Sequence, residues 1–600
     1  MAVKPSSTAA TIPKKPQSLK SRTIELHQKR IGEALSFPIQ LSDQIAAAAK
    51  EAESFKFECS EVAKQVERLR QMLRSAARLA ADAAYDRPLR RVAAEVTKTL
   101  ERSLALMKKC RRRSALRRVV TIVSAADFRK LLALLDASAA DMKWILSILD
   151  GGGGIVLTLP PIASNDPIIA WVWALTAALH IGQLQDKIEA ANELASLARD
   201  NDRNKQIIVE EGGIPPLLKL LKDRTSSEAQ IAAASSLINL ANDQNRVQAI
   251  IDEHGAPIIA QILGNSAVKV QIKVASLVAE MAQNSPLAQE EFARENVIRA
   301  LVTLLSFDLF VENSMLKLGE NSIHSIVQIN KESSVLSSSS SSYPSQSAEM
   351  KIELKTSCAK ALWMLARGSV ANSRRIAETK GLLCLAKLIE VERGELQRNC
   401  LMSLTEITTA AESNADLRRA AFKTNSPAAK GVVDQLIRII QESDDPSLQV
   451  ASIRAVGCLA RTFPAREMRV LGPLVALLGH GDEAVAAEAA AALGKFGCPD
   501  NFLCVQHCKT IIEFGGVPLL MRLLRSNNDE ARLHGVILAC YLAIHAGKSD
   551  DLEREGVAGA LEGVDRALIV QHPQLKELIP QAIYHLTVFH HSHSGMLTQR

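Results

Sequence analysis

The sequence has few aromatic side chains and no strong excess of charge of either sign. Aromatic residues make up 4% of the 600 residues, whereas apolar residues make up 47%. A core built mainly from Leu, Ala, Ile and Val favours closely packed helices over β-sandwiches, which depend on aromatic and β-branched side chains. The net charge of +7 is small for this length. It argues against a protein built around nucleic acid, in which basic residues dominate a whole face.

No segment is long and apolar enough to cross a membrane or to direct secretion. The most apolar stretch, residues 168–182, has about 15 residues, and a membrane-spanning helix needs roughly 20. We expect it to be a buried capping helix. The N-terminus lacks the apolar core of a signal peptide, position 2 is not Gly, and no prenylation motif ends the chain. These features predict a soluble, cytoplasmic protein.

Cysteines occur singly rather than in pairs. All ten are scattered, mostly within apolar helical stretches, and this pattern predicts buried thiols in a reducing compartment rather than disulfides. The densest group is Cys498, Cys504, His507 and Cys508, but it lacks the paired CxxC units of structural zinc sites. We therefore expect no metal ion and no cofactor.

Motifs for catalysis are also missing. The glycine run at 151–154 lacks the Lys-Ser/Thr ending of a phosphate-binding loop. No Ser/His/Asp or Cys/His arrangement can be placed, and no carboxylate pair belongs to an identifiable cleft. The sequence predicts a protein that is not an enzyme and has no small-molecule substrate.

A helical segment recurs at a fixed spacing. Residues 210–221 read EEGGIPPLLKLL, 252–263 read DEHGAPIIAQIL and 294–305 read RENVIRALVTLL, so each copy begins 42 residues after the previous one. A fourth copy, EFGGVPLLMRLL, occupies 513–524. A period near 40 without strand alternation is typical of an all-helical solenoid, in which each unit buries its apolar face on the next. Such an array predicts a long surface that binds other proteins.

The chain is predicted to contain five successive parts. They are a disordered N-terminus (1–22), a helical bundle (23–150), a Gly/Pro linker (151–167), a repeat solenoid (168–590) and a tail (591–600).

Within the bundle, the apolar spacing predicts two helices before Asp86 and a third that Pro88 opens, because Pro suits the first turn of a helix. A fourth helix is expected over roughly 114–135 and a short fifth over 141–149.

One segment interrupts the solenoid, at about residues 309–350. Ten of the fifteen residues from Ser333 to Ser347 are serine, so this part cannot bury an apolar face and is predicted to be flexible. Met281 in one repeat matches Leu365 in the next recognisable one, which is 84 residues later or two periods. The insert therefore either replaces a degenerate repeat or is a loop.

The repeated unit resembles the armadillo repeat over roughly residues 184–590. The shared features are a short helix ending in Glu-Gly-Gly, a second helix of the type GIPPLLKLL and a long third helix ending like SLINLA. The glycine pair permits a sharp turn with positive φ, and Pro fits the first turn of the second helix. The resemblance implies an all-α fold, with an N-terminal helical bundle followed by a right-handed armadillo-repeat superhelix, an α-solenoid.

The whole chain resembles the plant armadillo-repeat-only proteins through IQLSDQIAAAAKEAESFKFEC, VVTIVSAADFRKLL, LPPIASNDPI and ASLARDNDRNKQIIVEEGGIPPLLKLLKD. This resemblance implies a scaffold for regulators of Rho-type (ROP) GTPases and for actin organisation, located at the plasma membrane during polarised tip growth. Cytoskeletal proteins are further expected partners. No U-box-like segment precedes the repeats. The alternatives are an adaptor of the nuclear-transport type and a ubiquitin-ligase-associated adaptor.

Residues for protein binding are sought on the third helices. In nuclear-import armadillo proteins, Trp and Asn lie four residues apart on each third helix and hold the cargo. Only Asn239 keeps the Asn pattern here and no position keeps Trp, which argues against nuclear import. Our candidates for contacts with a protein ligand are Asn239, Glu280, Lys273 and Arg454, and a solvated surface is the alternative.

A basic cluster lies near the end of the predicted third bundle helix. Its seven cations are Lys108, Lys109, Arg111, Arg112, Arg113, Arg117 and Arg118. The helix dipole favours cations at this end, but seven exceed that need. An anionic lipid surface attracts each nearby cation by about 1 kcal/mol, so the cluster predicts peripheral contact with the plasma membrane. A nuclear-localisation signal and a solvated charge run are the alternatives.

Overall fold

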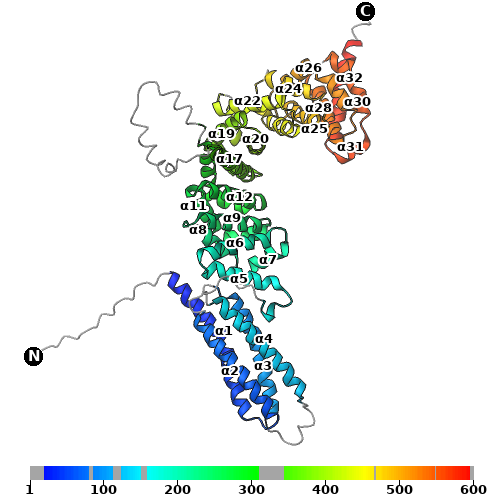
Figure 1. The fold of residues 1–600 in the computed structure, drawn as a ribbon. Coiled ribbons are helices and arrows are strands. Elements are labelled where there is room, and N and C mark those ends of the chain that lie inside the picture. The colour runs from blue at the N-terminus through cyan, green and yellow to red at the C-terminus, as the bar shows by residue number, and fades with distance from the viewer. Residues whose placement is uncertain are drawn as a thin grey trace, which may run out of the picture. The chain divides into compact units, whose positions relative to one another are not determined.

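The computed structural model describes residues 19–79, 85–111, 123–149, 159–307, 309, 344–423, 425–464, 468–547 and 549–594. These residues form 30 α-helices and two short 3₁₀ helices (Figure 1), and the extended pairing among them is an isolated bridge between Ala52 and Arg111. The predicted all-α fold is therefore confirmed. The chain divides into two compact units, Met1–Leu240 and Ala241–Arg600. No helix within the described ranges is both long and apolar enough to span a membrane.

The first unit contains the bundle and the first repeats. Its helices are α1 (Leu19–Lys50), α2 (Lys56–Leu79), α3 (Arg87–Cys110), α4 (Ala125–Leu149), the 3₁₀ helix η2 (Pro161–Ala163), α5 (Pro167–Ile181), α6 (Leu184–Ala198), α7 (Asp202–Glu210), α8 (Ile214–Lys222) and α9 (Ser227–Leu240). α1 begins within the stretch that was expected to be disordered.

The bundle consists of four long helices, α1 to α4. α1 packs on α2 and α3, and α4 packs on the same two helices. On α3, Val92, Val96 and Leu100 recur at the spacing of one helical face, and all three are buried. The expected division into helices at 114–135 and 141–149 is wrong, because a single helix, α4, runs unbroken from Ala125 to Leu149; residues 112–122 lie outside the described residues. Its central residues, DASAAD, contain neither Gly nor Pro to end a helix.

α5 is a buried helix, as predicted, and it belongs to the core of the bundle. Trp173 is 1% exposed, and its ring centroid lies 6.0 Å from that of Trp144 on α4. The segment before α5 is also attached to the bundle, since the backbone N–H of Ile162 donates a 2.8 Å hydrogen bond to the Asp141 carboxylate. The end of the Gly/Pro segment is thus fixed against α4.

The bundle and the first complete repeat meet at Glu211, which follows α7. One carboxylate oxygen accepts a 2.8 Å hydrogen bond from the Trp173 indole. The other forms a 2.8 Å ion pair with Arg91 on α3. The backbone carbonyl of the same residue accepts a bond from the Tyr85 hydroxyl at 3.1 Å. The side chain of Glu211 is only 14% exposed, so this residue holds the bundle, α5 and α7 in one body.

The second unit is a series of three-helix repeats. Its first helices are α10 (Gln244–Asp252), α13 (Pro286–Arg294), α18 (Val370–Glu378), α21 (Ala415–Ala421), α26 (Cys504–Glu513) and α29 (Asp550–Arg554). Its second helices are α11 (Gly255–Asn265), α14 (Val297–Ser306), α19 (Gly381–Val391), α22 (Pro427–Glu442), α24 (Met468–Leu477), α27 (Gly516–Leu523) and α30 (Val557–Glu562). Its third helices are α12 (Val268–Asn284), α17 (Pro344–Ala366), α20 (Gly394–Ser413), α23 (Pro446–Cys458), α25 (Glu483–Gly497), α28 (Asp529–His545) and α32 (Leu575–Ser594), with α31 (Arg566–Gln571) before the last.

The two positions of the glycine pair have different roles in the turn between first and second helices. The residue at the first position adopts positive φ in the turns that follow α7, α10, α13, α18, α26 and α29: Gly212 (82°), His254 (59°), Asn296 (58°), Lys380 (63°), Gly515 (72°) and Gly556 (68°). The second position is restricted by space instead. A Cβ added to Gly381 would lie 2.6 Å from the carbonyl oxygen of Ile376. Positive φ was expected of the pair, but it belongs to the first position alone.

The insert lies inside one repeat, between its second and third helices. α17 packs on α14 as its own second helix and on α12 as the preceding third helix. The Gln289 side chain on α13 donates a 2.9 Å hydrogen bond to the carbonyl of Met364 on α17. Met281 and Leu365 are therefore one repeat apart despite their 84-residue separation, and no repeat is missing between them. Residues 344–350, which the sequence placed in the insert, belong to α17, whereas 308 and 310–343 lie outside the described residues.

Candidate functional site

The third helices of the second unit form a continuous row. α12, α17, α20, α23, α25 and α28 each pack on the next in the series. Side chains that point away from the core of this row include Lys273, Lys360, Met402 and Glu406, which are exposed or half-buried. We call these third-helix positions the third-helix face. Because neighbouring repeats present equivalent positions side by side, an extended ligand could contact several repeats at once.

Asn239, the predicted residue in the first unit, holds two third helices together. Its side-chain amide on α9 donates a 2.8 Å hydrogen bond to the backbone carbonyl of Ala195 on α6. Ser236, one turn earlier, makes a similar 2.5 Å bond to Ala191. Asn239 remains half-buried, and its amide nitrogen is already bonded to α6.

Two predicted residues lie on α12. Lys273 is exposed, and Glu280 is half-buried two turns later. The Glu280 carboxylate accepts a 3.1 Å hydrogen bond from Asn284, whose amide also donates to the carbonyl of Ala241 at 3.1 Å. Lys273 is thus the more accessible of the two for contact with a partner.

Arg454, the fourth predicted residue, is already held by a neighbouring repeat. Its guanidinium on α23 makes two hydrogen bonds to the Glu488 carboxylate on α25, at 3.2 and 2.7 Å. This interaction raises the pKa of Arg454. The paired geometry presents a fixed, nearly neutral pair rather than a free cation to a ligand.

A second group on the same helices was not predicted from the sequence. The ammonium of Lys495 on α25 lies 2.8 Å from the Glu412 carboxylate on α20 and 3.4 Å from the Cys458 sulfur on α23. Burial raises the pKa of the Cys458 thiol to about 11, so the thiol is protonated at neutral pH. Because this Lys and this Glu lie two repeats apart, no local feature of the sequence indicates that they form an ion pair.

The basic cluster is only partly described. Lys108 and Lys109 are exposed in the last turn of α3, and Arg111 forms a 3.0 Å ion pair with Glu51. Arg112, Arg113, Arg117 and Arg118 lie outside the described residues. The described cations thus reach solvent at one end of the bundle, the end that also carries the Ala52–Arg111 bridge.

The cysteine and histidine group near residue 500 is separated by the fold. His507 is fully buried, and its Nε2 lies 3.1 Å from the carbonyl of Pro464. The Cys508 thiol is directed toward the carbonyl of Tyr541 instead. Across the described ranges, no three His, Cys, Asp or Glu side chains are close enough together to hold a metal ion.

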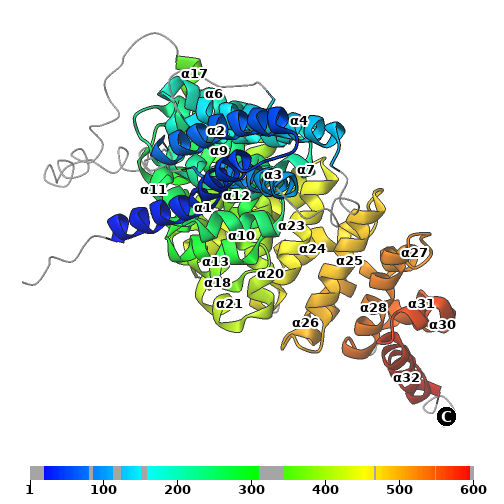
Figure 2. The ribbon, with the colours of Figure 1, turned by 90° about the horizontal axis from the view of Figure 1, so that it is seen from below.

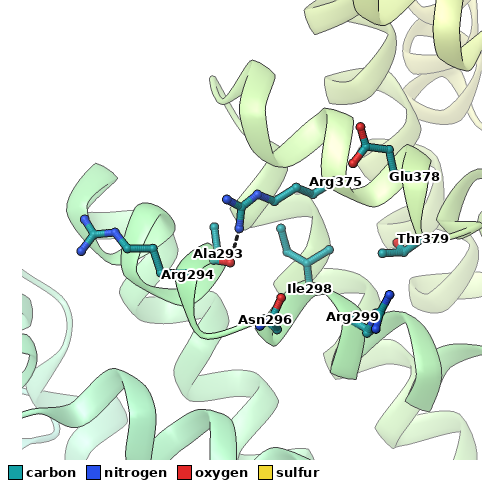
Figure 3. A pocket seen from close by; sticks show the side chains of 8 residues that line it. All are labelled: Ala293, Arg294, Asn296, Ile298, Arg299, Arg375, Glu378 and Thr379. Carbon is teal, nitrogen blue, oxygen red and sulfur yellow. Dashed lines mark hydrogen bonds between the residues drawn. The ribbon is translucent and has the colours of Figure 1, made fainter.

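A polar cavity of about 590 Å³ lies where two successive repeats meet (Figure 3). Arg294, Arg299 and Arg375 line it, together with the acidic Glu378. The Arg375 guanidinium donates to the carbonyl of Ala293 at the end of α13, as the dashed line shows. Arg294 pairs with Glu291 at 2.7 Å. Of these cations, Arg375 therefore joins the two repeats, whereas Arg294 is paired within its own helix.

Comparison with protein families identifies two segments of the chain. Residues 32–150, which correspond to the bundle, match a domain of unknown function (DUF7792). Residues 201–241, which contain α7, α8 and α9, match the armadillo/β-catenin-like repeat. The armadillo resemblance is thus confirmed for this repeat. No curated protein matches the chain.

Several solved structures are similar to this chain. One is an engineered protein from a structural genomics consortium, with 23% identity, coverage of 70% of this chain and 99% of that one, and a TM-score of 0.46. A designed armadillo repeat protein has 18% identity, coverage of 48% and 98%, and a TM-score of 0.36. A designed armadillo repeat protein in complex with the peptide (KR)4 has 16% identity, coverage of 48% and 98%, and a TM-score of 0.36.

Proposed function

We propose that this protein is a non-enzymatic scaffold that binds other proteins through its third-helix face. The observation that carries this proposal is the unbroken packing of six successive third helices, α12 to α28. The armadillo repeat places the third helices of neighbouring repeats side by side, so a ligand can contact several of them. Lys273, Lys360 and Glu406 are accessible to solvent on this face, and none of them is needed to close the core.

The partners we propose are regulators of Rho-type GTPases and proteins that organise actin, at the plasma membrane of cells in polarised tip growth. This finer proposal is supported by the resemblance of the whole chain to the plant armadillo-repeat-only proteins. The order of the parts, a helical bundle matched over 32–150 and then an armadillo repeat, agrees with that resemblance. Protein partners fit the mixed charge of the third-helix face better than a uniformly basic or acidic ligand would.

We also propose that the basic cluster brings the protein to the anionic inner surface of the plasma membrane. Lys108 and Lys109 are exposed beside one another at the end of α3. Each cation near such a surface contributes about 1 kcal/mol, and the attraction falls with added salt.

Site-specific photocrosslinking tests the scaffold proposal. A photoreactive phenylalanine analogue replaces Lys360 or Met402 on the third-helix face of the full chain, and Lys387 on the exposed side of α19 is the control position. Purified regulators of plant Rho-type GTPases should crosslink at the first two positions and not at the third. Equal crosslinking at all three positions, or none with any regulator, would contradict the proposal.

Sedimentation with vesicles tests the membrane proposal. The full chain should bind vesicles that contain phosphatidylserine, and binding should weaken at high salt. Replacing the seven cluster cations by Gln should abolish binding, whereas replacing the exposed Lys219 and Lys222 of α8 should not. Binding that survives the loss of the cluster would show that the cluster is not the lipid contact.

A further inference from the structure

One repeat of the second unit lacks a proper first helix. First helices elsewhere in this unit have 9 residues in α10, α13 and α18, 7 in α21, 10 in α26 and 5 in α29. Between α23 and α24, the described residues up to Pro464 hold only the 3₁₀ turn η3 (Ala460–Thr462) at the corresponding position, and residues 465–467 lie outside the described residues. Figure 2 shows the first helices α10, α13, α18 and α21 following one another, whereas α26 stands apart from α21. The series is therefore interrupted at this one repeat.

The segment that replaces the helix is held against the following repeat. The Asn501 side chain donates to the carbonyl of Ala460 at 3.3 Å. His507 reaches the carbonyl of Pro464 at 3.1 Å, and the Phe463 ring stacks on Phe496 with centroids 5.6 Å apart. These contacts hold the described part of the segment, up to Pro464, against α25, α26 and the turn between them.

A cavity of about 430 Å³ lies where the first helix is missing. It is bounded by the same elements that surround a first helix in a regular repeat. Phe422 follows the preceding first helix, Val433 belongs to the preceding second helix, Leu459 and Phe463 flank the 3₁₀ turn, and Arg469 lies on the repeat's own second helix. In a regular repeat, α18 likewise packs on α14, α19 and α21. The floor of the cavity is therefore apolar, and the elements around it correspond to those that contact a first helix in a regular repeat.

The rim of the cavity is positively charged. Lys430 and Arg469 line it, and the acidic side chain beside them, Asp434, is paired with Arg469 at 3.1 Å. Lys430 is exposed, and Lys423 next to Phe422 is also exposed. The rim therefore favours a ligand with carboxylates beside its apolar side chains.

We propose that this cavity binds an amphipathic helix of a partner protein, which takes the place of the missing first helix. The helix inserts an apolar face between α22 and α24, and its acidic flank lies against Lys430 and Arg469. A helix of two to three turns presents about three apolar side chains on one face, and a cavity of this size falls within the range of ordinary ligand pockets. The site is separate from the third-helix face, so it constitutes a second binding function.

Selection from a phage-displayed library of helical dodecamers tests this proposal with the full-length chain as bait. Selected peptides should carry apolar residues at spacings of three and four with Asp or Glu beside them. Their affinity, measured by fluorescence anisotropy, should fall at least tenfold for Ala429→Trp, which fills the cavity, and for Lys430→Glu, which reverses a rim charge. Lys222→Glu on α8 is the control and should leave the affinity unchanged.

Each outcome of this selection decides the question. If no selected peptide loses affinity with Ala429→Trp and Lys430→Glu, the cavity is not a helix-binding site. If cavity-dependent peptides have basic flanks, or are not helical when bound, the proposed occupant is wrong. Lys430→Glu changes an exposed side chain and keeps the fold, so its result stands even if Ala429→Trp disturbs α22. Crosslinking at the third-helix face is unaffected by either variant, which separates this proposal from the scaffold function.

Discussion

The indole of Trp173 and the carboxylate of Glu211 form a 2.8 Å hydrogen bond that joins the buried helix α5 to the first complete repeat. Arg91 adds an ion pair to the same carboxylate and also lies over the Trp173 ring, 5.7 Å from its centroid. Glu211 is the second acid of the recurring EEGG segment. A residue of the repeat signature thus anchors the bundle, which makes the bundle and the first repeats a single structural body.

Glu211→Ala should loosen this joint. The substitution removes the hydrogen-bond acceptor of the Trp173 N–H and the ion-pair partner of Arg91. A hydrogen bond to a charged acceptor contributes about 1.5–3 kcal/mol to stability. Glu211→Gln should cost about half as much, because the amide oxygen can still accept one bond. Amide hydrogen exchange of the full chain is the measurement, and α5 and α7 should exchange faster. Gln206→Ala on the exposed face of α7 is the control, and equal effects of Gln206→Ala and Glu211→Ala would contradict the anchoring role.

Lys380→Gly should stabilise the turn between α18 and α19. Lys380 has a φ of 63°, a conformation that costs an L-residue about 1–2 kcal/mol and costs Gly little. The extra flexibility of unfolded Gly offsets about 0.5–1 kcal/mol of this gain, so we expect a small net increase in local stability by hydrogen exchange. The same substitution at Lys387, in the exposed middle of α19, should instead cost about 1 kcal/mol. A loss at both positions would show that the left-handed conformation is not strained.

Gly381→Ala, one residue later, should have the opposite effect. The new Cβ would lie 2.6 Å from the Ile376 carbonyl oxygen and 2.7 Å from its Cγ2, so α18 and α19 must separate. Overpacking of this kind costs about 1–3 kcal/mol. A lower thermal unfolding temperature, with faster exchange confined to this repeat, is the expected result. An unchanged Gly381→Ala protein would mean that the close approach of the two helices is not required.

The repeats could be predicted from the sequence because their signals are local. The apolar spacing of GIPPLLKLL, the prolines and the glycines all act within a dozen residues, and each expected segment forms two helices and a turn. The division of α4 was predicted wrongly because its small residues weaken the apolar pattern without ending the helix. Spacing alone could not decide between a degenerate repeat and a loop at the insert, since the distance from Met281 to Leu365 equals two periods although the two residues are one repeat apart.

The candidate contacts could be predicted only in part. The pattern of third helices places Lys273 and Arg454 on the same kind of surface. It does not show that Arg454 forms an ion pair with Glu488, or that Lys495 forms one with Glu412. Those pairings depend on which third helices lie side by side and on the stagger between repeats. The 3₁₀ turn Ala460–Thr462, which stands where a first helix is expected before α24, was also not predicted, because these three residues contain no signal that distinguishes a turn from a short helix.

Cysteine reactivity should be low and site-selective. Burial raises the pKa of the Cys384 and Cys540 thiols to about 12 and that of Cys458 to about 11, so these residues have little thiolate at neutral pH. Of the ten cysteines, Cys498 and Cys504 alone are not fully buried. Iodoacetamide at pH 7.5 should therefore label these two in the folded protein, and all ten after unfolding in guanidinium. Rapid labelling of Cys458 in the folded protein would show that the helices around this thiol open readily.

Asp141→Asn should stabilise the bundle at neutral pH and lose this advantage in acid. Burial is the main influence on Asp141 and raises its pKa to about 6, against the usual 3.8. The folded state then binds this proton more tightly than the unfolded state, so the free energy of unfolding falls as the pH rises from about 4 to 6 and is constant above. Asn removes this dependence and can still accept the Ile162 N–H bond. We expect a gain of about 1–3 kcal/mol at pH 7 that disappears below pH 4, measured by hydrogen exchange of α4 amides across this range.

Asp136→Asn on the exposed face of the same helix is the control and should show no such pH-dependent gain. A gain for Asp141→Asn that is equal at pH 4 and pH 7 would mean that the titration of this carboxyl is not its source.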